Sequence, residues 1–301
     1  MRAAAEAPTP YAENMTAQSG SSDRAEGQVG AALRRAGLAI ERVAREVACA
    51  ERHERLAAET GRDFHVTMAA THRRVAERHQ ISAELQKKYA YGLIDGVAES
   101  NVQHLFMSAV AETCGTSSAA LTLMGADLTQ LALAASDKLS RSAQDLEYVL
   151  NMGPACDAVR SRRQVCVSGP TMEERWPGYG AGLSQLGLAS VIALPLKLQG
   201  DCVGALTVFD SRPGLAPSGI FGKVADALAE SMLLGPDADP DLYGETDHRA
   251  VVHQAVGVLS EQIHCSLTDA LALIKARAFA RGEAPESVAC QIVSGSLKLH
   301  Y

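Results

Sequence analysis

The chain has 301 residues, a net charge of −7 and 47% apolar residues, which is long enough for about two globular domains. No stretch approaches the roughly 18 apolar residues that a membrane span needs, and the N-terminus lacks the apolar core of a secretory signal. The 7 cysteines are odd in number, widely spaced and free of any C-x-x-C pair, so they favour reduced thiols in the cytoplasm and no structural metal site. A thiol or metal sensor in the middle of the chain is the minor alternative.

The N-terminal third predicts a disordered tail followed by paired helices. Residues 1–22 combine two prolines with Ser, Gly and Asn and predict the tail. Residues 25–91 predict a helical hairpin or coiled coil that turns near Gly61, because apolar residues recur at alternating steps of three and four. An isolated hairpin could bury only one apolar stripe on each helix. We therefore expect a homodimer through these N-terminal helices, with packing on the neighbouring domain as the alternative. The apolar seam of the first helix consists of Leu33, Ala36, Ile40, Val43, Val47, Ala50 and Ala57.

Three histidines of the second helix, His65, His72 and His79, are spaced by seven residues and so share one helical face. Seven residues span two turns, about 10.5 Å, and neighbours at that distance cannot share one metal ion. We therefore expect solvated histidines on the polar face rather than metal ligands.

The middle of the chain, residues 95–235, predicts an α+β domain with one antiparallel sheet flanked by helices. This part also carries the acidity, since residues 92–246 hold 9 Lys/Arg and 18 Asp/Glu. In chain order, we expect a helix at 97–114, strands at 118–124 and 128–135, helices at 142–149 and 155–160, a strand at 165–167, a helix at 180–186, strands at 190–198 and 202–209, and a helix at 217–234.

Short motifs in this segment follow one another in a recognisable order. They are Ala135-Ser-Asp, Gly153-Pro154 with Asp157-Ala158, Arg175-Trp176-Pro177, Ser190 to Leu196 with Pro195 inside, and Val203-Gly-Ala-Leu. In this order they resemble a GAF domain, a small-molecule sensing module of bacterial regulators. The resemblance implies a pocket for a small-molecule, redox or protein signal, while the ligand and any cofactor stay unknown. Related actinobacterial domains read Gly-Pro-Cys, where this chain has Ala155 followed by Cys156.

The last segment predicts a linker and a compact three-helix domain at residues 246–301. Residues 236–245 are rich in Pro and Asp and predict the linker. Thr246 or Asp247 caps the first helix, while Leu267 and Val293 belong to the apolar faces of the second and third. The boundaries between the three helices rest on local signals, which are Ser266 as a cap, Gly282 as a stop and Pro285 as a start.

Four motifs of this domain occur between residues 248 and 297. They are His253-Gln-Ala-Val-Gly-Val-Leu, Cys265-Ser-Leu-Thr-Asp-Ala-Leu, Ala276-Arg-Ala-Phe-Ala-Arg-Gly and Val288-Ala. They resemble the ANTAR domain, an RNA-binding module of transcription antitermination regulators. The resemblance implies binding to structured RNA with hairpin loops. Many members carry Lys where this chain has Val256.

The candidate RNA-binding residues come from the first two helices of this domain. Arg277 and Arg281 lie one turn apart, and paired guanidinium groups suit phosphate contact, although a solvated face is the alternative. Gly257 interrupts a helix at a cost of about 1 kcal/mol, which indicates close approach of a partner backbone or of another helix. We expect Phe279 and Trp176 to be buried rather than to stack on a ligand. The full set is His253, Gln254, Ala255, Gly257, Lys275, Arg277 and Arg281.

The sequence as a whole predicts a cytoplasmic, homodimeric, signal-responsive regulator and no enzyme. It contains no G-x-S-x-G, P-loop, H-E-x-x-H or G-x-G-x-x-G motif, and Asp157 and Asp210 have no partner that the sequence identifies. Residues 247–301 hold 5 Lys/Arg and 5 Asp/Glu, so RNA affinity is expected to be modest. The alternative is a ligand-sensing protein-interaction scaffold whose last domain dimerises or binds DNA.

Overall fold

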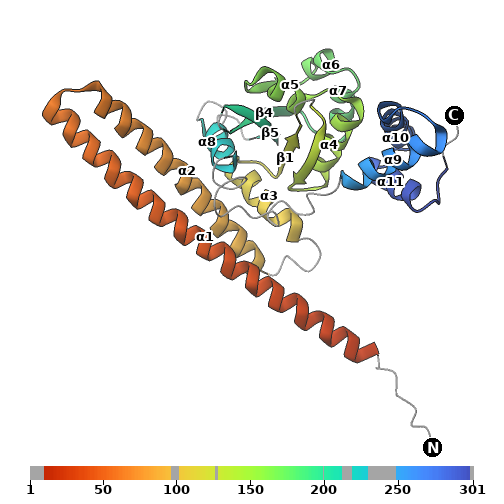
Figure 1. Ribbon diagram of the computed structural model, residues 1–301, viewed down its shortest axis with the longest axis horizontal. Coiled ribbons are helices and arrows are strands. Elements are labelled where there is room, and N and C mark those ends of the chain that lie inside the picture. The colour runs from red at the N-terminus through yellow and green to blue at the C-terminus, as the bar shows by residue number, and fades with distance from the viewer. Residues whose placement is uncertain are drawn as a thin grey trace, which may run out of the picture.

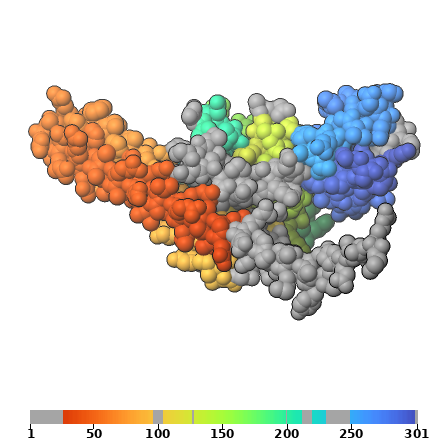
Figure 2. Space-filling model, turned by 60° about the horizontal axis from the view of Figure 1, so that its bottom comes forward, coloured from red at the N-terminus to blue at the C-terminus, as the bar shows by residue number. Residues whose placement is uncertain are grey.

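The computed structural model places a helical hairpin, an α+β domain with one antiparallel sheet, and three C-terminal helices along one elongated molecule (Figure 1). The space-filling view in Figure 2 shows the hairpin and the C-terminal helices at opposite ends, with the sheet domain between them. The structure describes residues 10–95, 102–125, 128–198, 200–211, 219–229 and 249–298.

The hairpin consists of α1 (Pro10–Thr60) and α2 (Asp63–Ile94), which pack against each other. The turn at Gly61, with φ of +65°, lies where the sequence predicts it. Helix α1 begins inside the segment expected to be a disordered tail, so that expectation is wrong for residues 10–22. Proline is tolerated in the first turn of a helix, where its missing N–H has no partner to lose. Residues 1–9 lie outside the described ranges.

The buried seam of α1 differs from the predicted one. The alanines at positions 32, 36, 39 and 50 are buried, whereas Leu33 and Ile40 are 43% and 42% exposed. The predicted seam therefore combined two neighbouring stripes. Small residues face α2 because they let the two helices approach closely, and Leu33 and Ile40 lie toward the outer face.

The histidines of α2 are not on a solvated face, which corrects the prediction. His65, His72 and His79 are half-buried, because their seven-residue spacing follows the seam between the two helices. His53 of α1 joins them, with its Nδ1 3.0 Å from the Nδ1 of His65 and its ring stacked on His72 at a centroid distance of 5.5 Å. Within the described ranges, no three His, Cys, Asp or Glu side chains are arranged to hold a metal ion.

The central domain is built on one antiparallel sheet, as the sequence predicts. Its strand order is β2-β1-β5-β4-β3, and every neighbouring pair is antiparallel. Because consecutive side chains of a strand point to opposite faces, the sheet buries two separate apolar layers. The strands are β1 (Ser118–Met124), β2 (Gln130–Ala135), β3 (Val165–Ser168), β4 (Ser190–Leu198) and β5 (Asp201–Phe209).

One face of the sheet is covered by α3 (Val102–Thr113) and α8 (Ile220–Ala227), and the C-terminal half of α2 packs on these two helices. Leu85 and Tyr89 of α2 share an apolar core with Phe106 of α3. The hairpin therefore packs on its neighbouring domain, and its outer half extends beyond it (Figure 1).

The opposite face carries α4 (Lys138–Leu150), α5 (Pro154–Ser161), α6 (Thr171–Arg175) and α7 (Tyr179–Gln185). Helix α4 begins earlier than predicted because Asp137 and Ser140 form a reciprocal cap, in which Asp137 Oδ1 accepts from the Ser140 N–H at 2.7 Å. The short α6 was not predicted. Trp176 is buried as expected, and its ring nitrogen donates to Asp157.

The C-terminal helices are α9 (Ala250–Ile263), α10 (Leu267–Arg281) and α11 (Pro285–Val293), which share one apolar core. The predicted signals are confirmed: Ser266 caps α10, Gly282 ends it with φ of +62°, and Pro285 starts α11. Leu267 and Val293 are exposed at helix ends, contrary to the prediction. The predicted caps Thr246 and Asp247 and the linker at 236–245 lie outside the described ranges.

None of the helices in the described ranges has both the length and the apolar character needed to cross a membrane.

Candidate functional site

A chain of buried polar side chains runs beneath α4 in the central domain. Thr122 of β1 donates from its hydroxyl to Gln144 Oε1 at 2.7 Å, and Gln144 Nε2 donates to Glu147 Oε2 at 3.2 Å. The backbone N–H of Cys156, in the first turn of α5, donates to Glu147 Oε1 at 2.8 Å. These bonds hold a fully buried carboxyl between the sheet, α4 and α5.

Burial dominates the electrostatics of this carboxyl. Removal from water raises the pKa of Glu147 to about 7, and the hydrogen bonds from Cys156 and Gln144 oppose that rise. Gly153 is needed beside it, because a Cβ there would lie 2.6 Å from the carboxyl carbon. Burial also raises the pKa of Tyr179, and the neighbouring Glu147 adds to that rise. Glu147 is therefore close to its titration midpoint at neutral pH.

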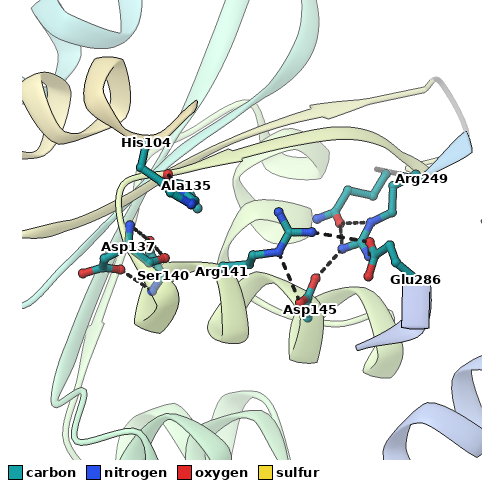
Figure 3. A network of polar contacts seen from close by, with 9 residues as sticks. His104, Ala135, Asp137, Ser140, Arg141, Asp145, Arg249 and Glu286 are labelled. Atoms are coloured by element: carbon teal, nitrogen blue, oxygen red, sulfur yellow. Dashed lines mark hydrogen bonds and ion pairs between the residues drawn. The ribbon is translucent and has the colours of Figure 1, made fainter. Parts of the chain in front are cut away.

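A second polar network joins the central domain to the C-terminal helices (Figure 3). Its centre is Arg249, directly before α9, whose side chain is fully buried. Arg249 donates to Gln130 Oε1 from Nε at 3.1 Å and from Nη2 at 2.7 Å, and to Asp145 Oδ1 at 2.9 Å. It also donates from Nη1 to Glu286 of α11. One guanidinium group thus connects β2, α4 and α11.

Tyr148 of α4 adds an aromatic surface to this network. The Arg249 guanidinium carbon lies 3.9 Å from the ring centroid of Tyr148, and Lys275 Nζ of α10 lies 4.0 Å from it. Burial raises the pKa of Asp145, while the charge of Arg249 opposes the shift. Arg141 is a second cation beside these carboxylates. Its Nε lies 4.0 Å from Asp145 Oδ2, and its Nη2 lies 3.9 Å from Glu286 Oε1.

A cavity of about 520 Å³ lies at this junction, where α10 packs against α4. Its wall on the central domain includes Met124, Glu147 and Leu150. Its wall on α10 includes Lys275 and Phe279. The cavity is therefore shared by two domains, and the buried Glu147 is part of its lining.

Comparison with known protein families identifies the central domain, because residues 101–226 match the GAF domain. The chain contains a GAF domain. The match covers both sheet faces described above and lies within the range predicted from the sequence. No curated protein matches the chain. The resemblance of residues 248–297 to the ANTAR domain stays a prediction.

The candidate RNA-binding residues of α9 do not share one surface. His253, Gln254 and Gly257 are exposed, but Ala255 is buried in the core of the C-terminal domain, so it is wrong as a contact residue. Val256 is buried as well. A Cβ added to Gly257 would meet no described atom within 4 Å, so close packing of another helix does not explain this glycine.

The candidates of α10 divide between two sides of the helix. Lys275 lies against Tyr148 of the GAF domain and is not part of a free basic face. Arg277 lies two residues further on, a rotation of roughly 200° around the helix. Arg277 is half-buried. Arg281 is exposed, and its Nη1 lies 3.6 Å from Glu283 Oε1. Phe279 is 60% exposed at the cavity, which corrects the prediction of a core position.

The residues at the centre of the junction were not found from the sequence. Arg249 and Gln130 are separated by 119 residues, and no local pattern connects them. The one available signal was a charged residue in the first turn of a predicted helix. Asp157 and Asp210 do have partners: Asp157 pairs with Arg175 at 2.9 Å, and Asp210 accepts the Ser190 N–H at 2.7 Å.

Proposed function

We propose that this chain is a non-enzymatic, signal-responsive regulator in the cytoplasm, in which the GAF domain controls an RNA-binding C-terminal domain. It acts by transcription antitermination or related post-initiation control through hairpin loops in RNA. The observation that carries the proposal is the fully buried Arg249, which ties the C-terminal helices to β2 and α4 of the GAF domain. A buried ionic contact of this kind makes the position of one domain depend on the other.

Helix α4 provides a physical route for the signal. Glu147 lies in the interior of the GAF domain, whereas its neighbours Asp145 and Tyr148 contact Arg249. Any ligand or partner that displaces this turn of α4 therefore changes the contacts of the C-terminal domain. A signal that binds the two positions of α4 with different affinity therefore couples the GAF domain to the C-terminal domain, as allostery requires.

The RNA-binding part of the proposal rests on the sequence resemblance and on two arginines. Arg277 and Arg281 lie one turn apart on the side of α10 away from Lys275, so docking on the GAF domain leaves Arg281 exposed. Charge-assisted bonds from guanidinium groups suit phosphate. Two copies joined by their N-terminal helices would bind paired hairpin loops with raised effective concentration.

A titration of full-length protein with tandem-hairpin RNA, at stated salt, tests this function. We expect saturable binding that exceeds binding to a scrambled RNA. Replacing both arginines, Arg277→Ala with Arg281→Ala, should weaken binding about tenfold or more, since each charged hydrogen bond contributes about 1.5–3 kcal/mol. The control is Lys298→Ala, an exposed cation of the same domain. Equal affinity for the hairpin and scrambled RNAs would exclude the proposed RNA function.

A second candidate is a ligand-sensing scaffold whose C-terminal domain dimerises or binds DNA. The observation in its favour is the small amount of free positive charge, since Lys275 contacts Tyr148 and residues 247–301 are balanced in charge. Competition by duplex DNA as strong as that by hairpin RNA would support the DNA form. A C-terminal domain that changes oligomeric state without binding nucleic acid would support the scaffold.

A further inference from the structure

The cavity between the GAF domain and α10 contains an ammonium group that has no counter-ion among the residues that the structure describes. Arg249, the fully buried cation of the junction, is paired with Asp145 and Glu286. Lys275 is different, because no carboxylate of the described ranges lies within ion-pair distance of its Nζ. Its contact is the ring of Tyr148, which attracts a cation but does not neutralise it.

The surroundings of Lys275 favour the arrival of an anion. Burial lowers the pKa of Lys275 to about 8, and the nearby Arg249 contributes to the decrease. Tyr148 lines the same cavity, and its hydroxyl is buried without a hydrogen-bond partner among the described residues. Buried polar groups of native proteins are rarely left unsatisfied, so this O–H is a donor without an acceptor. An ammonium group and an O–H donor together are suited to a carboxylate.

Apolar side chains make up much of the rest of the cavity wall and are suited to an apolar body. Leu150 of α4 and Leu271 of α10 contribute aliphatic surface, and Phe279 presents an aromatic ring that is 60% exposed. A large exposed aromatic ring at a cavity can bury its area against a ligand. The volume of about 520 Å³ lies within the range of about 300–1,000 Å³ that small-molecule sites occupy.

We propose that this junction cavity binds a small apolar carboxylic acid, with the carboxylate at Lys275 and the Tyr148 hydroxyl and the apolar body against Leu150, Leu271 and Phe279. The inference rests on the sensing part of the proposed function and adds the chemical class of the signal. Because both domains contribute to the site, such an acid binds the docked arrangement more tightly than the separated one. Binding therefore shifts the population toward the docked arrangement.

Calorimetric titration of the full chain, in the absence of RNA, tests the site with 2-naphthoate and its neutral analogue 2-naphthamide. We expect the acid to bind about tenfold or more tightly than the amide, as a charged hydrogen bond contributes about 1.5–3 kcal/mol. Lys275→Gln should abolish that preference, and Lys275→Arg should retain it. Tyr148→Phe should reduce the preference without removing a charge. Lys298→Gln, an exposed control on the same domain, should bind as the native protein does.

Two results would overturn the proposal. One is the absence of naphthoate binding at millimolar concentration in the native protein. The other is a preference for the acid that persists unchanged in Lys275→Gln and Tyr148→Phe, provided that their circular dichroism spectra match the native one. Because no RNA is present, a negative result here leaves the RNA titration unaffected, and failure of RNA binding leaves acid binding measurable.

Discussion

Glu147 is an ionisable group in the interior of the GAF domain, and no opposite charge from the described part of the chain contributes to its pKa. Its hydrogen-bond partners are the Cys156 N–H and the Gln144 amide, which are neutral. Its pKa therefore rises from 4.5 to about 7 on folding. Below pH 4.5 both folded and unfolded states are protonated, and the shift has no effect. As pH rises from 4.5 to 7, the unfolded state ionises first, so the folded state loses stability; above pH 7 the loss is complete.

The replacement Glu147→Gln should therefore stabilise the protein increasingly as pH rises. A glutamine keeps an oxygen for the Cys156 N–H but does not ionise. We expect its advantage in unfolding free energy over the native chain to grow by about 1–3 kcal/mol between pH 5 and pH 8, since one pKa unit corresponds to about 1.4 kcal/mol. Urea unfolding at pH 5, 6, 7 and 8 measures this. The matched control is the exposed Glu174→Gln, whose difference from native should be constant. A constant difference for Glu147→Gln as well would contradict the assignment.

At the scale of elements, local signals predicted boundaries well and predicted packing partners poorly. Ser266, Gly282 and Pro285 act through their own backbone geometry, so they could be read without knowing the fold. The seam of α1 could not, because alanine and leucine both continue the apolar period and only the distance to α2 decides between them. The histidine spacing had the same ambiguity. A seven-residue repeat identifies a shared face but not whether that face meets solvent or another helix.

The exposed face of α1 carries the next prediction. Leu33 and Ile40 are seven residues apart and project from the same side, whereas Leu38 projects from a side roughly 140–160° away. We expect the first pair to form the homodimer contact. Lys at both positions, Leu33→Lys with Ile40→Lys, should convert a dimer into a monomer, because two ammonium groups would have to be buried. Sedimentation equilibrium at micromolar concentration measures the mass.

Leu38→Lys is the matched control for this experiment, since Leu38 is 42% exposed on the same helix. The Leu38→Lys variant should remain dimeric and should sediment with the same mass as the native chain. A native chain that sediments as a monomer would refute the contact outright. A Leu33→Lys, Ile40→Lys variant that stays dimeric would show that another surface joins the two copies.

At the scale of the whole molecule, the fold brings together groups that the sequence keeps apart. Gln130, Asp145, Arg249 and Glu286 come from four separate elements and meet only because the C-terminal helices dock on β2 and α4. Sequence periodicity could place Arg277 and Arg281 on one face, because that relation lies within one helix. It could not assign Lys275 to the GAF domain, because that contact depends on the docking of two domains. The junction was therefore beyond any pattern within a single segment.

The docking itself should depend on Arg249. In Arg249→Met, the carboxylates of Asp145 and Glu286 lose their buried cation, and breaking such a pair costs about 3–5 kcal/mol. We expect the C-terminal domain to separate from a GAF domain that stays folded. Hydrogen exchange at the two surfaces, α4 and α10, should then accelerate by about a hundredfold or more, whereas exchange in β4 and β5 should be unchanged. The control is Arg281→Met, which removes an exposed guanidinium paired only loosely with Glu283. Arg249→Met with native exchange at both surfaces would show that apolar packing alone holds the domains together.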